Sequence, residues 1–197
     1  MRRILSLIAA LAVSVAVVPA ELVVNGSFED PIIGGQGQTF YGGITGWTIS
    51  GSIDILRNYW ENADGLQSID LSGLEAGSIS QWIPTEVGGS YVLSYSMAGN
   101  PDGGIKQMVV LWGGSVLETN TFDTAGQSIG NMGWLDYQHV VTSSSNFTQL
   151  QFVSLTVGNA GPALDSVSLV IPEASSAMWL GLALTFLILR GRRLTRK

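Results

Sequence analysis

Between Glu21 and Ile171 the chain consists of short apolar runs separated by turn residues, and apolar positions alternate with polar or small ones. The clearest case is Tyr91–Ala98, in which every second residue is large and apolar or aromatic. A period of two is typical of strands with one buried face, whereas an amphipathic helix needs apolar residues three and four positions apart. The pattern therefore predicts an all-β domain and excludes alternating strand–helix units.

Nine segments carry this pattern and are predicted as strands: 52–56, 67–71, 77–82, 91–98, 107–112, 115–121, 135–142, 149–157 and 163–171. Gly113-Gly114 separates two of them and is a signal for a two-residue hairpin. Loops are predicted at 31–43, 59–65, 99–104 and 123–133. About ten short strands fit a jelly-roll β-sandwich, which we expect over residues 21–171.

The first twenty residues have the features of a secretory signal peptide. Arg2 and Arg3 precede an apolar stretch, 4–18, and Val18-Pro19-Ala20 places small residues at −3 and −1 of a cleavage site before Glu21. The prediction is cleavage by signal peptidase, and the alternative is an uncleaved N-terminal anchor.

The C-terminal end is predicted to hold a membrane anchor. Residues 174–189 carry no charge, and five basic residues follow between Arg190 and Lys197. A helix of this length spans roughly 24 Å, a little less than the ~30 Å hydrocarbon core of a bilayer. Because basic residues mark the cytoplasmic end, residues 172–197 place the domain on the periplasmic or extracellular side of the membrane.

The charge of the predicted domain limits its ligands. Residues 21–173 contain all fifteen acidic residues of the chain and two basic ones, Arg57 and Lys106, hence a formal charge of −13. Such a domain repels phosphate backbones, so nucleic-acid binding is excluded, whereas neutral ligands or divalent cations are compatible. The chain has no cysteine, and a domain of about 150 residues is large enough to fold without disulfides.

Several motifs occur in an order that resembles a known family. ELVVNGSFEDP opens the domain, GWTISGSIDIL, YWENADGLQSIDLSG and YVLSYSMAGNPDGG follow, and GPALDSVSLV closes it. Together they resemble the choice-of-anchor C family of exported bacterial domains, which are related to plant cell-wall proteins. The resemblance implies a galactose-binding-like jelly roll and no defined biochemical activity.

The tail resembles a PEP-CTERM sorting signal, in which a Pro-Glu-Pro-like motif precedes a hydrophobic helix and a basic end. The motif here is Pro172, Glu173 and Ala174, so alanine stands in place of the second proline. The resemblance implies processing by an exosortase, after which the domain is released to the cell surface or matrix.

The resemblance also implies a structural Ca²⁺ where the first and last strands of the jelly roll meet. Glu29 of NGSFE and Asp165 of ALDSV occupy the matching positions, and Asn25 could add an oxygen. Ca²⁺ takes six to eight oxygen ligands, so backbone carbonyls would have to complete the shell. The alternative is that Glu29 caps a turn and Asp165 is a hydrogen-bonded buried acid.

A sugar-binding surface is the second predicted site. Neutral glycans stack on aromatic faces while amides and carboxylates bind their hydroxyl groups. The predicted ligand-binding residues are Tyr59, Trp60, Asn100, Asp102 and Trp134, all in or beside polar loops. Trp47, Trp82 and Trp112 are instead predicted to lie in the core.

Enzyme signals are absent from the sequence. His139 is the single histidine and alternates with Tyr137 and Val141, which favours a position on a strand face. No Gly-x-Ser-x-Gly elbow and no metal-binding histidine pair occurs. The sequence therefore predicts a non-catalytic exported protein that binds or organises extracellular polysaccharide. The alternatives are a purely structural biofilm or envelope component and, less favoured, a glycan hydrolase.

Overall fold

A computed structural model describes residues 20–172. Residues 1–19 of the predicted signal peptide and residues 173–197, with Glu173, Ala174 and the predicted membrane helix, lie outside the described residues. Within 20–172 no helix is long and apolar enough to cross a membrane.

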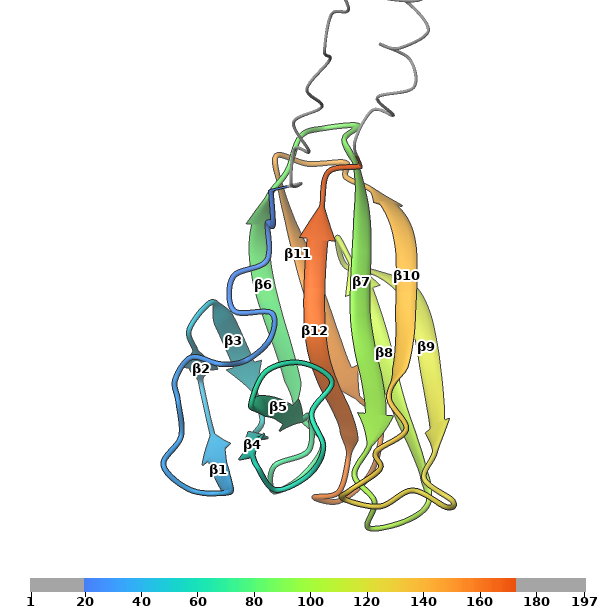
Figure 1. Cartoon of the computed structure of the whole chain (residues 1–197). Helices are drawn as coiled ribbons and strands as arrows, with labels where there is room; N and C mark the ends of the chain where they lie inside the picture. The colour runs from blue at the N-terminus through green and yellow to red at the C-terminus, as the bar shows by residue number, and fades with distance from the viewer. Residues whose placement is uncertain (1–19, 173–197) are drawn as a thin grey trace, which may run out of the picture.

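The described residues form a sandwich of two antiparallel sheets (Figure 1). Sheet A has the order β1 (Gly37–Phe40), β4 (Ile53–Arg57), β5 (Gln67–Asp70), β12 (Pro162–Val170), β7 (Ser90–Gly99) and β10 (Leu135–Thr142). Sheet B has the order β2 (Gly43–Ile44), β3 (Trp47–Ser50), β6 (Ser78–Pro84), β11 (Phe147–Ser154), β8 (Ile105–Trp112) and β9 (Ser115–Asp123).

The nine predicted strands all exist, with ends that differ by a few residues. The hairpin at Gly113-Gly114 is confirmed, because it joins β8 to β9 and both glycines have positive φ, 58° and 80°. A turn with positive φ at both central residues matches the twist of the flanking strands. Residues other than glycine, asparagine and aspartate adopt a positive φ only at a cost in conformational free energy.

The predicted loop 31–43 is wrong over part of its length, because it contains β1 and the start of β2. Both strands are short and lie at the outer edges of their sheets. Each therefore has a single partner strand, β4 for β1 and β3 for β2. So short a segment shows too few alternations for a period of two to be recognised.

The inward-facing side chains of the two sheets form one apolar core. On β7 the alternation is borne out, since Tyr91, Leu93, Tyr95 and Met97 are all buried. Trp47 and Trp112 lie in the core as predicted, and Trp47 packs against Phe152 with ring centroids 6.2 Å apart.

The NGSF motif attaches the first described residues to the last strand. Asn25 and Phe28 have φ of 56°, and Phe28 is buried against Trp47 at a centroid distance of 5.8 Å. Between them Gly26 accepts a hydrogen bond from the backbone N–H of Val167 at 2.9 Å. Val167 lies at a bulge in β12, where the pairing with β7 is shifted between Asp165 and Ser168.

The described chain starts and ends side by side. Glu21 forms a bridge with Val170, and the backbone N–H of Leu22 donates to Leu169 O at 2.9 Å. The loops that follow β7 and β9 lie at the opposite end of the sandwich (Figure 1).

Candidate functional site

Glu61 joins two of the predicted loops. Its backbone N–H donates to Ile129 O at 2.8 Å, and its Oε2 accepts the backbone N–H of Met132 at 3.0 Å. Its carbonyl oxygen accepts the indole N–H of Trp134 at 2.8 Å. These three bonds connect the loop between β4 and β5 to the loop between β9 and β10, although the loops are about seventy residues apart in sequence.

An open groove of about 510 Å³ lies beside this junction, on the outer face of sheet A. Trp134 and Asn62 border it, while Ser94 and Ser96 of β7 and Asp136 of β10 line it. These β7 serines alternate with the buried residues of the strand and therefore point away from the core. Ser96 Oγ donates to Asp136 Oδ1 at 2.7 Å, which orients the carboxylate.

The groove presents an indole ring, hydroxyl groups, an amide and carboxylates, with no basic side chain among its lining residues. Aromatic faces contact the C–H surfaces of sugars, and the polar groups can donate to or accept from sugar hydroxyls. Chemically, the groove suits an uncharged, hydroxyl-rich ligand and disfavours an anion.

Trp134 is the one predicted ligand-binding residue that this groove contains. Asp136, Ser94 and Ser96 were missed, because a strand residue on a polar face gives no sign of what lies above it. A sequence signal was available only for Asp136, which lies two residues after Trp134 in an exposed position.

The prediction that Trp60 binds the ligand is wrong. Its side chain is 4% exposed, and its indole N–H donates to Ser68 Oγ at 2.7 Å. Neither face of the ring can therefore stack on a sugar, because the loop folds back and uses Trp60 to cover the core. The neighbouring Tyr59 is exposed and lies 6.0 Å from Trp60 by ring centroids.

Asn100 and Asp102 lie away from the groove. The Asn100 amide donates to Asp70 Oδ2 at 2.8 Å, and its Oδ1 accepts the backbone N–H of Asp102 at 3.1 Å. Both polar ends of Asn100 are thus engaged within the protein. The Asp102 side chain is exposed.

The two predicted calcium carboxylates both hold the loop between β4 and β5. Glu29 Oε1 accepts the backbone N–H groups of Leu66 and Gln67, at 2.5 and 2.8 Å. Asp165 Oδ2 accepts those of Ala63 and Asp64, at 3.0 and 2.9 Å. Burial raises the pKa of the Asp165 carboxyl to about 7.

These contacts match the alternative prediction, in which Glu29 caps a turn and Asp165 is a hydrogen-bonded buried acid. They also occupy carboxylate lone pairs that a bound cation would need. Asn25 likewise uses its amide locally, donating to Asp30 O and Thr45 O. Within residues 20–172 no three His, Cys, Asp or Glu side chains gather around a common point. The three residues thus fit Ca²⁺ only with a shell made mostly of backbone oxygens and water, and calcium stays a prediction.

Trp82 was predicted to lie in the core, and this is wrong: its side chain is 65% exposed. On β6 Ile79, Gln81 and Ile83 are buried and face the core, so Trp82 falls on the outward positions of the strand with Ser80; Ser78, at the start of the strand, is buried as well. The alternation in the sequence could have shown this, because Trp82 shares its parity with the serines and not with the isoleucines.

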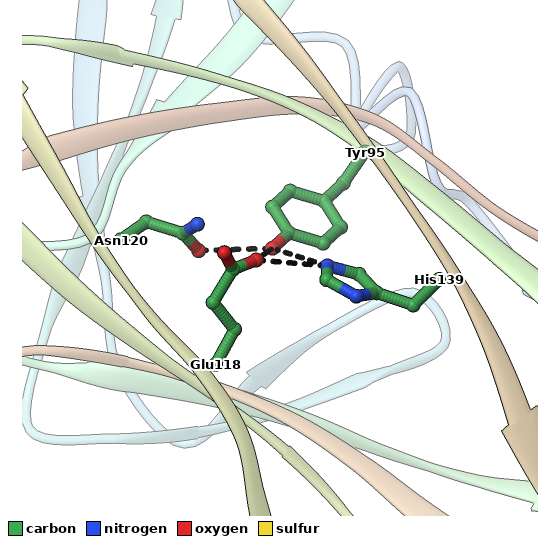
Figure 2. A network of polar contacts seen from close by, with 4 residues as sticks. All are labelled: Tyr95, Glu118, Asn120 and His139. Atoms are coloured by element: carbon green, nitrogen blue, oxygen red, sulfur yellow. Dashed lines mark hydrogen bonds and ion pairs between the residues drawn. The ribbon is translucent and has the colours of Figure 1, made fainter.

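A polar network closes the side of the sandwich where β9 and β10 are the outermost strands (Figure 2). The Tyr95 hydroxyl donates to Asn120 Oδ1 at 2.9 Å, and His139 Nε2 lies 2.8 Å from Glu118 Oε2. Tyr137 stacks on Tyr95 with ring centroids 5.2 Å apart. His139 lies on a strand, as predicted, and its partners come from both sheets.

This network does not form a Ser-His-Asp triad. Burial, reinforced by the Glu118 carboxylate, raises the pKa of the Tyr95 phenol well above its usual range, so the phenol remains protonated. In the described part of the chain no serine or threonine hydroxyl is hydrogen-bonded to His139, whereas a triad needs a nucleophile there.

Comparisons with known proteins agree with the fold. The solved structure of TmCBM61 in complex with β-1,4-galactotriose has a TM-score of 0.51, at 15% identity, covering 77% of this chain and 99% of that one. The CBM22-1 xylan-binding domain from Paenibacillus barcinonensis Xyn10C has a TM-score of 0.49, at 13% identity, covering 70% and 95%. The likeness to TmCBM61 shows that the domain has a jelly-roll sandwich fold like that of a carbohydrate-binding module.

A curated relative is Halomucin from Haloquadratum walsbyi, which is 34% identical over 168 residues. The alignment covers 80% of this chain and 2% of that protein. A family model matches residues 21–170, which include all twelve strands of the described sandwich. The chain therefore belongs to the family described as "Protein of unknown function (DUF642)".

Proposed function

We propose that this domain binds neutral polysaccharide outside the cell, without catalysis, in the groove on the outer face of sheet A. The observation that carries the proposal is the position of Trp134. Its indole N–H is fixed on Glu61 O, and its ring borders a groove that is also lined by the hydroxyl and carboxylate groups of Ser94, Ser96 and Asp136.

The comparisons support this proposal at the level of the fold. TmCBM61 was solved with a galactotriose, and the shared jelly roll is compatible with a similar class of ligand. The acidic domain repels polyanions and accepts neutral glycans. Many weakly binding copies at one surface would retain a polysaccharide through avidity.

Replacing Trp134 with alanine is expected to weaken binding to β-1,4-galactan or another retained neutral polysaccharide by about tenfold or more, because the stacking surface is lost. The measurement is affinity electrophoresis of the purified full chain through gels that contain galactan, xylan or an unrelated neutral glucan. Tyr41→Ala is the matched control, since Tyr41 is exposed and lies outside the lining of the groove.

A second variant separates loss of the ring from a loosened loop. Ser94→Gln adds bulk to the groove and leaves the bond between Trp134 and Glu61 in place. Both variants should show weaker retardation; Ser94→Gln should melt like the parent, whereas Trp134→Ala should melt at a lower temperature because its ring packs against the core and its indole N–H donates to Glu61 O. If neither variant changes retardation in any of the gels that slow the parent, the groove is not the binding site. If no gel slows the parent, the structural-component alternative replaces the proposal.

The same proposal places the protein at the cell envelope, as a choice-of-anchor C-type domain with a PEP-CTERM-like tail. Cell fractionation with mass spectrometry of the mature C-terminus is expected to find a chain that begins at Glu21 and is truncated near Pro172. An intact Lys197 in the inner-membrane fraction would instead identify a plain anchor and reject exosortase processing.

A further inference from the structure

The outer face of sheet B carries two exposed aromatic side chains on neighbouring strands. Trp82 of β6 is 65% exposed, and Phe147 of β11 is 59% exposed. In the register of these strands Trp82 pairs with Gln149, and Phe147 pairs with Pro84. The two aromatic residues are therefore diagonal neighbours on one face of the sheet, and the Cα atoms of such neighbours lie roughly 7–8 Å apart.

A groove of about 290 Å³ continues this surface toward the turn between β8 and β9. The backbone N–H of Gly113 donates to Gln149 O at 2.9 Å, so the turn lies directly beside Gln149. Gly114 has no atom within 4 Å of the position where a Cβ would stand. The two glycines thus leave open the space that side chains would fill. We call Trp82, Phe147, Gln149, Gly113 and Gly114 the sheet B platform.

The chemistry of the platform limits its ligand. The residues that line the groove are uncharged, although they belong to a strongly acidic domain: Trp82, Gly113, Gly114, Ser144, Ser145, Phe147, Thr148 and Gln149. Without a basic side chain the surface has no partner for phosphate or an anionic lipid headgroup. Aromatic faces beside an amide and hydroxyl groups match the C–H surfaces and hydroxyl groups of a sugar.

From this arrangement we propose that the sheet B platform is a second binding face for neutral polysaccharide. Trp82 and Phe147 provide the stacking surface, and Gln149 donates to and accepts from sugar hydroxyls. The face goes beyond the proposed function, which uses the groove on sheet A. Since the two faces belong to opposite sheets, one domain can hold two polysaccharide chains and cross-link them.

Three measurements on the purified full chain test this proposal, one of them the sedimentation velocity of the protein alone. Affinity electrophoresis measures binding to galactan, xylan and a neutral glucan, and turbidity measures the precipitation of the same soluble polysaccharides. Trp82→Ala is compared with Trp134→Ala, with the double variant and with Tyr41→Ala. Trp82→Phe keeps a stacking ring and should behave more like the parent than Trp82→Ala does. Because Trp82 is exposed, its replacement should leave the melting temperature nearly unchanged.

The expected result is that Trp82→Ala weakens retardation by several-fold to tenfold and abolishes precipitation, while the double variant loses both. If Trp82→Ala precipitates polysaccharide like the parent, the proposal is overturned. It is also overturned if the variant changes only the sedimentation of the protein alone, since the platform is then a contact between copies of this chain. Loss of binding in Trp82→Ala with full binding in Trp134→Ala would support the platform and refute the groove on sheet A.

Discussion

Replacing Gly26 with alanine is expected to destabilise the domain by about 3 kcal/mol, the upper part of the range for an overpacked interior site. The added Cβ would meet the carbonyl group of Val167, 2.9 Å from its carbon atom and closer still to its oxygen. That carbonyl belongs to the backbone of β12, which cannot rotate away as a side chain could, because β12 pairs with both β5 and β7.

The clash has a second consequence, since Gly26 O accepts the backbone N–H of Val167 at 2.9 Å. Relief requires the NGSF segment to move away from β12, which breaks this bond and withdraws the buried Phe28 from the core. For a domain of this size a loss of about 3 kcal/mol lowers the melting temperature by about 10 °C.

Thermal and urea unfolding followed by circular dichroism measure this effect. Gly34→Ala is the matched control, because nothing lies within 4 Å of its added Cβ and its φ is not in the left-handed region. Its stability should stay within about 0.5 kcal/mol of the parent. Equal melting temperatures for Gly26→Ala and Gly34→Ala would contradict the close docking of the NGSF segment on β12.

The domain is expected to become less stable as the pH rises from 5 to 8, and Asp70 accounts for a large share of this loss. Asp70 is 1% exposed at the end of β5. Its carboxyl group accepts the backbone N–H groups of Ser72 and Gly161, at 2.8 and 3.0 Å, and the Asn100 amide at 2.8 Å. Burial outweighs these bonds and raises its pKa from 3.8 to about 7.

The direction of this pH dependence follows from the proton that the folded protein holds on Asp70. Between pH 4 and pH 7 the folded protein keeps a proton on Asp70 that the unfolded chain has released, so the stabilisation is complete below 3.8 and is lost as the pH rises through about 7. From pH 5 to pH 8 the loss from this one carboxyl is on the order of 2–3 kcal/mol. The charged groups that influence Asp70 are Asp54 on β4, which raises its pKa further, and Lys106 on β8.

Asp70→Asn cannot ionise, so its unfolding free energy should fall less steeply over this range, whatever its absolute stability. The measurement is urea unfolding at several pH values in one buffer series. Asp165, whose pKa burial also raises to about 7, continues to contribute, so about half of the slope should remain. Asp102→Asn removes one charge from an exposed loop and should retain the full slope. Equal slopes in Asp70→Asn and Asp102→Asn would show that Asp70 ionises freely in the folded protein.

The two tryptophan corrections show where reasoning from the sequence was insufficient. Trp60 lies in the predicted polar loop 59–65 and was expected to be exposed to a ligand, but Ser68 provides the hydrogen-bond acceptor that allows its burial. Trp82 ends an apolar run and was expected to be buried, but its place in the alternation turns it outward. The hydrophobicity of a side chain predicts that burial stabilises it. Whether the side chain can be buried depends on the geometry of the sheet, because only alternate positions of a strand face the core.

The all-β character, nine of the strands and the hairpin at Gly113-Gly114 could be read from local patterns. A strand alternates its side chains because of its own backbone geometry, and a turn requires particular φ values from one or two residues. These properties need no distant partner, so they are visible in short stretches of the chain.

The groove on sheet A required the folded chain. It combines Asn62, Ser94, Trp134 and Asp136, which come from two different loops, from β7 and from the start of the edge strand β10. Strand pairing and the bonds of Glu61 bring them together. Alternation shows which side chains share a face of one strand, but which strands become neighbours depends on how the two sheets bury their apolar faces against each other.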